Sequence, residues 1–242
     1  MPNVVDDAYA LGAGGDVLAV TDYTEYPAEA SSKRSIGLPM IPSVEKIVAL
    51  HADLVLGEGN LNQAETVEEL QRVGIPVFLV APHGTEGIYH SLASLGIALD
   101  QADSAPVLIA QLRASEAAVR RRVSGKPVIS VLVPIWFNPI TTIGKHDFIT
   151  ELIEIAGGHS VTRELQQGWP QVSLEAVMAW APQGLLLVQG SKMSAAQIRG
   201  LPGWSALLAV RNGRYFTVDD RIKSPSPAAI DALEQLAQQF HP

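Results

Sequence analysis

The sequence predicts an α/β fold in which two parallel-sheet lobes are joined by one long rigid helix. Short apolar segments alternate with helical segments in both halves of the chain, which is the pattern of βαβ units. Residues 104–123 read SAPVLIAQLRASEAAVRRRV, with no glycine and only an early proline, so they predict a single helix roughly 30 Å long. We therefore expect an N-terminal lobe at 1–100, a connecting helix at 104–124 and a C-terminal lobe at 126–242.

The first lobe is predicted to open with a helix. Apolar residues recur at helical spacing at Val4, Val5, Ala8 and Leu11, and the glycines within 12–15 are expected to end this helix. The elements expected next are a strand ending at Val20, a turn-rich loop at 21–35, helices at 43–51, 63–73 and 85–95, and strands at 53–57 and 76–81.

The second lobe resumes the alternation after the turn SGKP. Its apolar runs and helical patterns follow one another at the spacing of a parallel sheet. The elements expected are strands at 128–133 and 214–218, helices at 146–156, 194–199 and 227–240, and a helix–strand unit at 173–188.

One helix–strand unit occurs twice in the sequence. SVEKIVALHADLVLG at 43–57 aligns with SLEAVMAWAPQGLLL at 173–187. In each copy a serine, Ser43 or Ser173, can cap the helix, and a glutamate, Glu45 or Glu175, sits in the first turn, where the helix dipole favours a carboxylate. The alternative is convergence, because any capped helix before an apolar strand has this pattern.

Composition excludes several classes of protein. The formal net charge is −8 and the cations are scattered, which argues against nucleic acid and anionic membrane surfaces as partners. No cysteine is present, so disulfides and thiolate chemistry are excluded, and no apolar run approaches the length of a membrane span. The start, MPNVVDDAYALG, does not have the pattern of a signal peptide, which taken literally predicts a cytoplasmic protein.

Catalytic signatures are missing from the chain. The GAGG at 12–15 follows a helix and lacks dinucleotide-site spacing, and no P-loop, HExxH or GxSxG motif occurs. His83 follows a predicted strand at the edge where α/β proteins bind ligands. A zinc site of His83, His146 and carboxylates such as Glu58 or Asp219 is an alternative that no ligand spacing supports. It would suit a cytoplasmic metal-dependent enzyme or chaperone, or a receptor for a free metal ion.

Aromatic residues gather in segments that follow predicted strands, and one more, Trp169, lies just before the second copy of the repeat. Such rings suit a large, flat, partly apolar ligand, whereas the alternative is that they pack onto their own lobes. The residues in question are Tyr23, Tyr26, Trp136, Phe137 and Trp169.

Two further tryptophans and two cations follow other elements. Trp180, inside the repeated helix, and Trp204, in LPGWSALLAV, are interpreted as core residues. Arg221 and Lys223 follow the last predicted strand and either meet an anionic group or are solvated surface charges.

The motifs together resemble a known family. ALGAGGDVLAVTDYTEYP, LQRVGIPVFLV, WFNPITTIGKHDFITELIEIAGG, WPQVSLEAVMAWAPQGLLL and LPGWSALLAVRNGRYFTVDD, in this order, are similar to the cobalamin and iron–siderophore solute-binding proteins of ABC importers. The resemblance covers essentially the whole chain, and the vitamin B12-binding branch is the nearest. It implies a non-enzymatic receptor with a class III periplasmic-binding-protein fold. Its cobalt- or iron-containing macrocycle or chelate is bound in the inter-lobe cleft, without a covalent cofactor or a metal site of its own.

The resemblance also implies roles for individual residues. Tyr23 and Trp169 match cleft residues of the B12-binding branch, and Trp136 and Phe137 fall where that branch places another. Glu45 and Glu175 match the glutamates by which the two lobes dock onto an ABC permease dimer.

The sequence departs from the B12-binding pattern in three places. Leu38 and Glu58 stand where tryptophans are expected, and Ala228 stands for an arginine, unless Arg221 or Lys223 substitutes for it. A corrinoid is favoured, with a ferric siderophore, haem or a cytoplasmic metal-binding role as the alternatives.

Family members also open with an export signal and a strand that this chain lacks. We therefore expect a truncated start, an N-terminal lobe without its first strand, and a monomeric protein of the periplasm or cell envelope.

Overall fold

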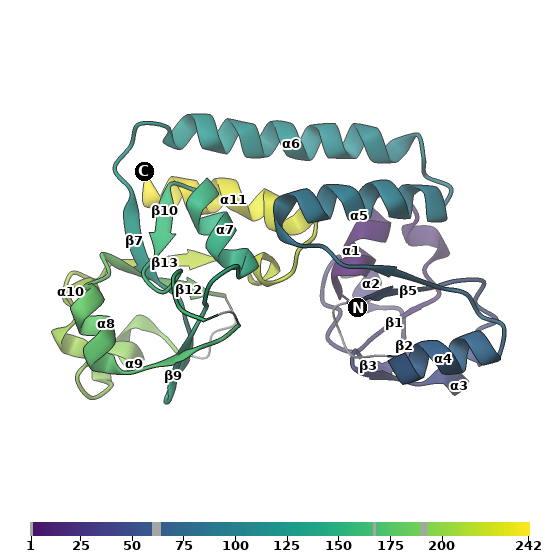
Figure 1. Ribbon diagram of the computed structural model, residues 1–242, viewed down its shortest axis with the longest axis horizontal. Coiled ribbons are helices and arrows are strands. Elements are labelled where there is room, and N and C mark those ends of the chain that lie inside the picture. Colours follow the sequence, from purple (N-terminus) through teal and green to yellow (C-terminus); the bar gives the residue numbers. More distant parts are fainter. Residues whose placement is uncertain (1, 60–63, 167, 190–192) are drawn as a thin grey trace. The chain divides into compact units, whose positions relative to one another are not determined.

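The structure is a computed structural model that describes residues 2–59, 64–166, 168–189 and 193–242. The chain forms two compact units. Unit 1 contains residues 1–112 and 224–227, and unit 2 contains residues 113–223 and 228–242. Each unit holds parallel strands and helices (Figure 1), which confirms the predicted α/β class.

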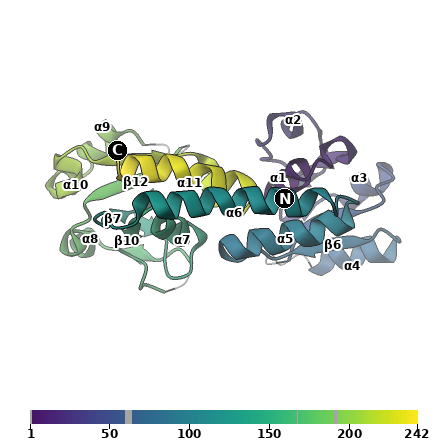
Figure 2. The ribbon, with the colours of Figure 1, turned by 90° about the horizontal axis from the view of Figure 1, so that it is seen from above.

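The long helix predicted between the lobes is present as α6 (Ser104–Val123), and its bounds match the prediction. It runs without a break (Figure 2), and the division between the units falls within it. Ala105, Leu112 and Val119, spaced seven residues apart, are its buried apolar side chains. Glu116, whose side chain is largely covered, accepts a charge-assisted bond of 2.7 Å from Arg120 one turn later, and this pairing stabilises that turn of the helix.

Unit 1 contains two short parallel pairs, β1 with β2 and β5 with β6, and the antiparallel hairpin β3–β4. Its helices are α1 (Pro2–Ala10), α2 (Ala28–Ser31), α3 (Val44–Ala49), α4 (Ala64–Arg72) and α5 (Gly84–Ala98). Its strands are β1 (Ala19–Val20), β2 (Arg34–Ser35), β3 (Gly37–Leu38), β4 (Ile41–Pro42), β5 (Val55–Glu58) and β6 (Val77–Val80). The predicted helix at 63–73 corresponds to α4, and residue 63 lies outside the described residues.

Unit 2 is built on a parallel sheet of order β10–β7–β12–β13, beside an antiparallel sheet of order β11–β9–β8. Its helices are α7 (Phe148–Ile155), α8 (Leu174–Trp180), α9 (Ala195–Gly200), α10 (Leu208–Arg211) and α11 (Pro227–Phe240). Its strands are β7 (Ile129–Leu132), β8 (Pro134–Phe137), β9 (Ile140–Thr142), β10 (Gly158–Ser160), β11 (Gln171–Val172), β12 (Gly184–Val188) and β13 (Tyr215–Val218).

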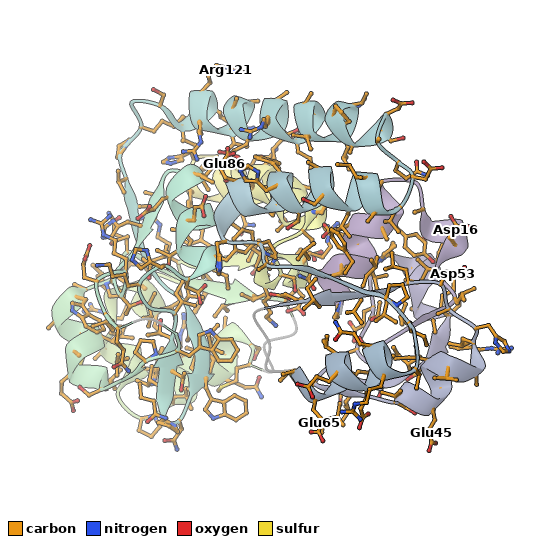
Figure 3. The ribbon with its side chains drawn as sticks, turned by 45° about the vertical axis from the view of Figure 1, so that its right-hand side comes forward. Asp16, Glu45, Asp53, Glu65, Glu86 and Arg121 are labelled. Carbon is orange, nitrogen blue, oxygen red and sulfur yellow. The ribbon has the colours of Figure 1, made fainter. Side chains whose placement is uncertain are left out.

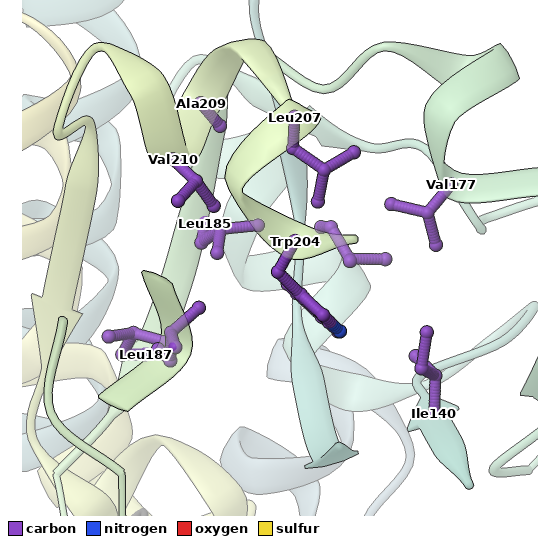
Figure 4. Packing of buried hydrophobic residues seen from close by; sticks show 10 residues of the cluster. Ile140, Val177, Leu185, Leu187, Trp204, Leu207, Ala209 and Val210 are labelled. Carbon is purple, nitrogen blue, oxygen red and sulfur yellow. The ribbon is translucent and has the colours of Figure 1, made fainter. Parts of the chain in front are cut away.

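Both faces of the parallel sheet in unit 2 are covered, as is usual for parallel strands. On one face, Leu185 and Leu187 of β12 pack into a cluster around Trp204, which is 3% exposed (Figure 4). On the other face, Phe216 of β13 meets Phe240 of α11 edge to face, with ring centroids 4.9 Å apart. The core position expected for Trp204 is confirmed.

The repeated helix–strand unit forms the same structure twice. The Ser43 hydroxyl accepts the Lys46 N–H at 3.3 Å at the start of α3, and the Ser173 hydroxyl accepts the Ala176 N–H at 3.2 Å at the start of α8. Both expected caps are confirmed, and each helix leads to a parallel strand, β5 or β12.

The short hairpins are not among the elements expected from sequence. β3–β4 and the β11–β9–β8 sheet consist of strands two to four residues long. Such strands carry little local pattern of their own, because their stability comes from pairing with distant residues.

Candidate functional site

The two exposed tryptophans of unit 2 belong to one small sheet. Trp136 pairs with Thr141, and Thr141 pairs with Gln171. Trp169 lies two residues before Gln171, and the chain beside it keeps bonding in the same register, since the Thr142 N–H donates to the Pro170 carbonyl at 3.0 Å. Because side chains alternate between the faces of a sheet, Trp136 and Trp169 share a face. They are 58% and 65% exposed, so this face meets solvent.

Polar groups hold both indoles by their N–H. The Trp136 Nε1–H donates to the Asn138 carbonyl at 3.0 Å. The Trp169 indole donates to Asp147, whose carboxylate also accepts the Ile149 N–H at 2.9 Å and so caps α7. Burial raises the pKa of Asp147 above its usual value, and these two hydrogen bonds oppose the rise. The ring edges are thereby fixed while the ring faces stay open.

Phe137 lies on the opposite face of the same sheet. Its ring meets Trp204 at a centroid distance of 5.1 Å, and its neighbours across the sheet, Ile140 and Val172, belong to or pack against the same core cluster. Phe137 therefore packs behind the face that carries Trp136 and Trp169 and does not lie on it.

In unit 1 the expected ligand residues follow the carboxyl ends of parallel strands. Tyr23, after β1, is 73% exposed and has a φ of 63°. This left-handed conformation is uncommon for a bulky residue, and it is fixed by a turn in which the Thr24 hydroxyl donates to the Thr21 carbonyl at 2.8 Å. Tyr26 is partly exposed, and His83 is exposed at the N-cap of α5 after β6.

The two cations expected near an anionic ligand are each matched by an aspartate. The Arg221 Nε–H donates to Asp219 at 2.8 Å, and this bond is the main reason that the pKa of Asp219 is lowered. Lys223 forms an ion pair with Asp220, three residues before it. The local positive charge is therefore largely compensated.

The two repeated helices present equivalent side chains to solvent. Glu45 and Glu175 are both exposed in the first turn, and Glu45 projects away from α3 (Figure 3). The pKa of Glu175 is lowered, first by a hydrogen bond from its own backbone N–H and then by the Ser173 hydroxyl, so its carboxylate is held in the charged form. One turn later each helix exposes an apolar side chain, Val48 or Met178.

Metal ligands do not gather in the part of the chain that the structure describes. Within those residues, no group of three or more histidine, aspartate or glutamate side chains is placed to hold a metal ion. The described helices also include none with the length and apolar character that a membrane crossing requires.

Comparison with known proteins assigns the chain to a family. The model of the periplasmic binding protein family matches residues 2–222. The chain belongs to this family. Among curated relatives, an uncharacterised ABC transporter substrate-binding lipoprotein, YvrC of Bacillus subtilis, is 29% identical over 100% of this chain and 78% of its own length. A vitamin B12-binding protein of Yersinia pestis is 27% identical over 99% of this chain and 84% of its own length.

Solved structures of periplasmic binding proteins share the fold. The apo form of a periplasmic haem-binding protein from Roseiflexus superposes with a TM-score of 0.89 at 24% identity, covering 99% of this chain and 95% of the other. The periplasmic vitamin B12-binding protein of Vibrio cholerae gives a TM-score of 0.80 at 22% identity, with coverage of 99% and 94%. The class III fold expected from the sequence, with two α/β lobes and one long joining helix, is confirmed.

Sequence reasoning missed Asp147 and the division of the aromatic residues between two faces. Asp147 falls at the start of the helix predicted at 146–156, with nothing to mark it as a partner of Trp169, because their bond joins positions 22 residues apart. The face of the small sheet on which each aromatic residue lies depends on the register of β8, β9 and β11, and no local sequence pattern predicts that register.

Proposed function

We propose that this protein is the solute receptor of an ABC importer and that its solute is a flat metal-containing macrocycle, with a corrinoid as the first candidate. It works in the cell envelope, binds its ligand without chemical change and hands it to a permease. The observation that carries this proposal is the pair of exposed indoles, Trp136 and Trp169, anchored by their N–H groups on one sheet face.

Anchored rings with open faces suit a ligand that is itself flat. A ring that is already fixed loses little conformational entropy on binding, so more of the stacking free energy appears as affinity. In unit 1, described by itself, Tyr23 is also an exposed ring, and it has a left-handed backbone conformation that is uncommon for a bulky residue. The relatives named for vitamin B12 and haem binding are consistent with such a ligand.

The charge around the site favours a corrinoid over an anionic ferric siderophore. A strongly anionic chelate needs cations that are free to meet it. Arg221 and Lys223 already face Asp219 and Asp220, and the chain as a whole is acidic, with a net charge of −8. Haem is the second candidate, because the exposed imidazole of His83 follows the carboxyl end of β6 and could ligate an iron atom.

Replacing Trp169 by alanine is expected to weaken ligand binding about tenfold, since one stacking surface is lost. Isothermal titration with cobalamin, haemin and a ferric siderophore measures the effect. Trp180→Ala is the matched control, because Trp180 is half-buried beside the core of unit 2 and is not on the aromatic face. Equal affinity of the Trp169→Ala variant and the unmodified protein would remove Trp169 from the site.

Each lobe is proposed to dock onto a permease dimer through its repeated helix. Glu45 and Glu175 are exposed, occupy equivalent positions and are both in the first turn behind a serine cap. Charges at such a rim set orientation and the rate of encounter more than final affinity. A permease dimer that carries one basic site for each lobe would bind both carboxylates.

The double substitution Glu45→Gln with Glu175→Gln is expected to slow ligand uptake at least about tenfold and to leave ligand affinity unchanged, because two charges are lost from the rim. Uptake of radiolabelled ligand by proteoliposomes that contain the transporter measures the first quantity. Glu65→Gln is the control, since Glu65 is an exposed glutamate in the first turn of α4 (Figure 3) and lies outside the repeat. Uptake as fast as that of the control would refute the docking role.

A further inference from the structure

Three hydroxyl side chains form a connected and fully buried group in unit 2. Ser160, Thr162 and Thr142 are each 0% exposed. Ser160 ends β10 and so belongs to the parallel sheet, whereas Thr142 ends β9, the central strand of the small antiparallel sheet. The Ser160 and Thr162 hydroxyls are 2.9 Å apart, and the Thr162 and Thr142 hydroxyls are 3.3 Å apart. The group therefore links the parallel sheet to the sheet that carries the exposed indoles.

Each of the two threonines donates its hydroxyl proton to a buried carbonyl. The Thr142 hydroxyl donates to the Val133 carbonyl at 2.9 Å, and the Thr162 hydroxyl donates to the Ile143 carbonyl at 2.7 Å. Since a hydroxyl has one proton, the Ser160 hydroxyl is left to donate to Thr162. Val133 and Ile143 are also 0% exposed, so bulk water cannot replace either bond.

The first of these carbonyls lies beside the strand of Trp136. Val133 directly precedes β8, and the register of β8 against β9 shifts between Pro134 and Trp136. Such a shift interrupts the ladder locally, and proline has no N–H to restore it. The bond from Thr142 to Val133 therefore holds β8 where its own pairing is interrupted. Because irregularities of this kind redirect side chains, the bond bears on the direction of Trp136.

The second carbonyl lies opposite Trp169. The Thr142 N–H donates to the Pro170 carbonyl at 3.0 Å, and this antiparallel register places Ile143 across from Trp169. The bond from Thr162 therefore holds the segment against which Trp169 lies. Each indole thus has its own buried threonine behind it.

A sheet of this size needs support from outside its own ladder. Its strands β8, β9 and β11 have four, three and two residues, so they share few backbone bonds. Valine would fill the same space as threonine without burying a polar group. A fully bonded group of buried hydroxyls instead favours one arrangement of the segments that it joins.

We propose that Thr142 and Thr162 are positioning residues for the stacking site, in which Thr142 positions Trp136 and Thr162 positions Trp169. A site whose rings are fixed before the ligand arrives loses less entropy on binding. The link to a ligand rests on the proposed function, whereas the positioning of the indoles is a property of the free protein.

Hydrogen exchange of the indole N–H groups, followed by NMR in isotope-labelled protein, tests the positioning without a ligand. We expect Thr142→Val to speed exchange at Trp136 about tenfold and Thr162→Val to speed exchange at Trp169 about tenfold, because each variant loses one buried bond. Thr142→Ser and Thr162→Ser keep the hydroxyl, so each should stay within about threefold of the unmodified protein. The signals are assigned with Trp136→Phe and Trp169→Phe.

A purely structural role predicts a different pattern. A general loss of stability would speed exchange at all four tryptophans of unit 2 by the same factor. That result, no change in either valine variant, or equal effects of serine and valine would overturn the positioning. Ser160→Ala keeps the test available if a valine variant does not fold. It removes only the donor to Thr162, so it should affect Trp169 more than Trp136.

Titration of the same variants with cobalamin, haemin and a ferric siderophore tests the link to the ligand. A compound that binds the unmodified protein should bind each valine variant about fivefold to tenfold more weakly and each serine variant normally. Unchanged affinity in both valine variants would overturn their role in the site. If none of the three compounds binds the unmodified protein, the proposed function fails, and the exchange experiment still decides the positioning.

Discussion

Replacing Trp204 by alanine is expected to lower the free energy of unfolding of unit 2 by about 3–5 kcal/mol. The Trp204 side chain is 3% exposed and packs among Ile140, Val177 and Leu207 (Figure 4). Its removal therefore costs both the transfer free energy of a large aromatic ring and the cavity left behind. Phe137 would also lose its ring partner at 5.1 Å. Urea unfolding followed by circular dichroism measures the change.

The control for this substitution makes the same chemical change in solvent. Trp169→Ala removes an indole that is 65% exposed and one hydrogen bond to Asp147, so it should lower the free energy of unfolding by only about 0.5–1.5 kcal/mol. The two variants should therefore have opposite profiles, since one loses stability and the other loses ligand affinity. A Trp204→Ala protein as stable as Trp169→Ala would show that the core described around Trp204 is wrong.

Replacing Asp7 by asparagine is expected to raise the free energy of unfolding by about 1–3 kcal/mol at pH 7. Asp7 is 0% exposed, and neither of its carboxylate oxygens has a hydrogen-bond partner in the structure as described. Burial raises its pKa well above the usual value, and the negative charges of Asp6 and Glu58 raise it further. At pH 7 the folded state therefore pays a free-energy cost in either protonation state of Asp7. An ionised Asp7 is a buried charge without a partner, and a protonated Asp7 must keep a proton that an exposed carboxylate would release.

The pH dependence of stability gives the sign of this effect. Because the pKa of Asp7 is higher in the folded state than in the unfolded state, its penalty is absent below the unfolded value, near 3.8. The penalty grows as the pH rises towards the folded value, so stability falls over that window. The asparagine variant should lose this part of the pH dependence. Asp16→Asn, at an exposed position in unit 1 (Figure 3), should retain it, and the same slope in all three proteins would contradict the buried, unpartnered state of Asp7.

The sequence predicts the long elements well because their patterns are local. The helices at 104–123 and 227–240 have the expected bounds, and both serine caps of the repeat are where the spacing places them. Strands such as 129–132 and 215–218 are found within one residue of the expected ends. An uninterrupted apolar run or a capped helix is specified by neighbours in the chain, so it can be seen without the fold.

The candidate site is predicted less completely because it depends on pairing between distant segments. Trp136 and Phe137 are adjacent in sequence, yet one faces solvent and the other faces Trp204, and only the register of the β11–β9–β8 sheet separates them. The ion pair of Arg221 could have been predicted from the sequence DDRIK, because Asp219 lies only two residues before Arg221 and can reach it.

The central proposal is that unit 2 stacks a flat metal macrocycle on its open indoles. All four tryptophans of the chain lie in unit 2, so intrinsic tryptophan fluorescence reports on that unit alone. The most direct test is a fluorescence titration of the purified protein with cobalamin, haemin and a ferric siderophore, supported by calorimetry. We expect saturable quenching with cobalamin, and about tenfold weaker binding when Trp169 is alanine. Absence of both quenching and heat with all three compounds would contradict the proposal.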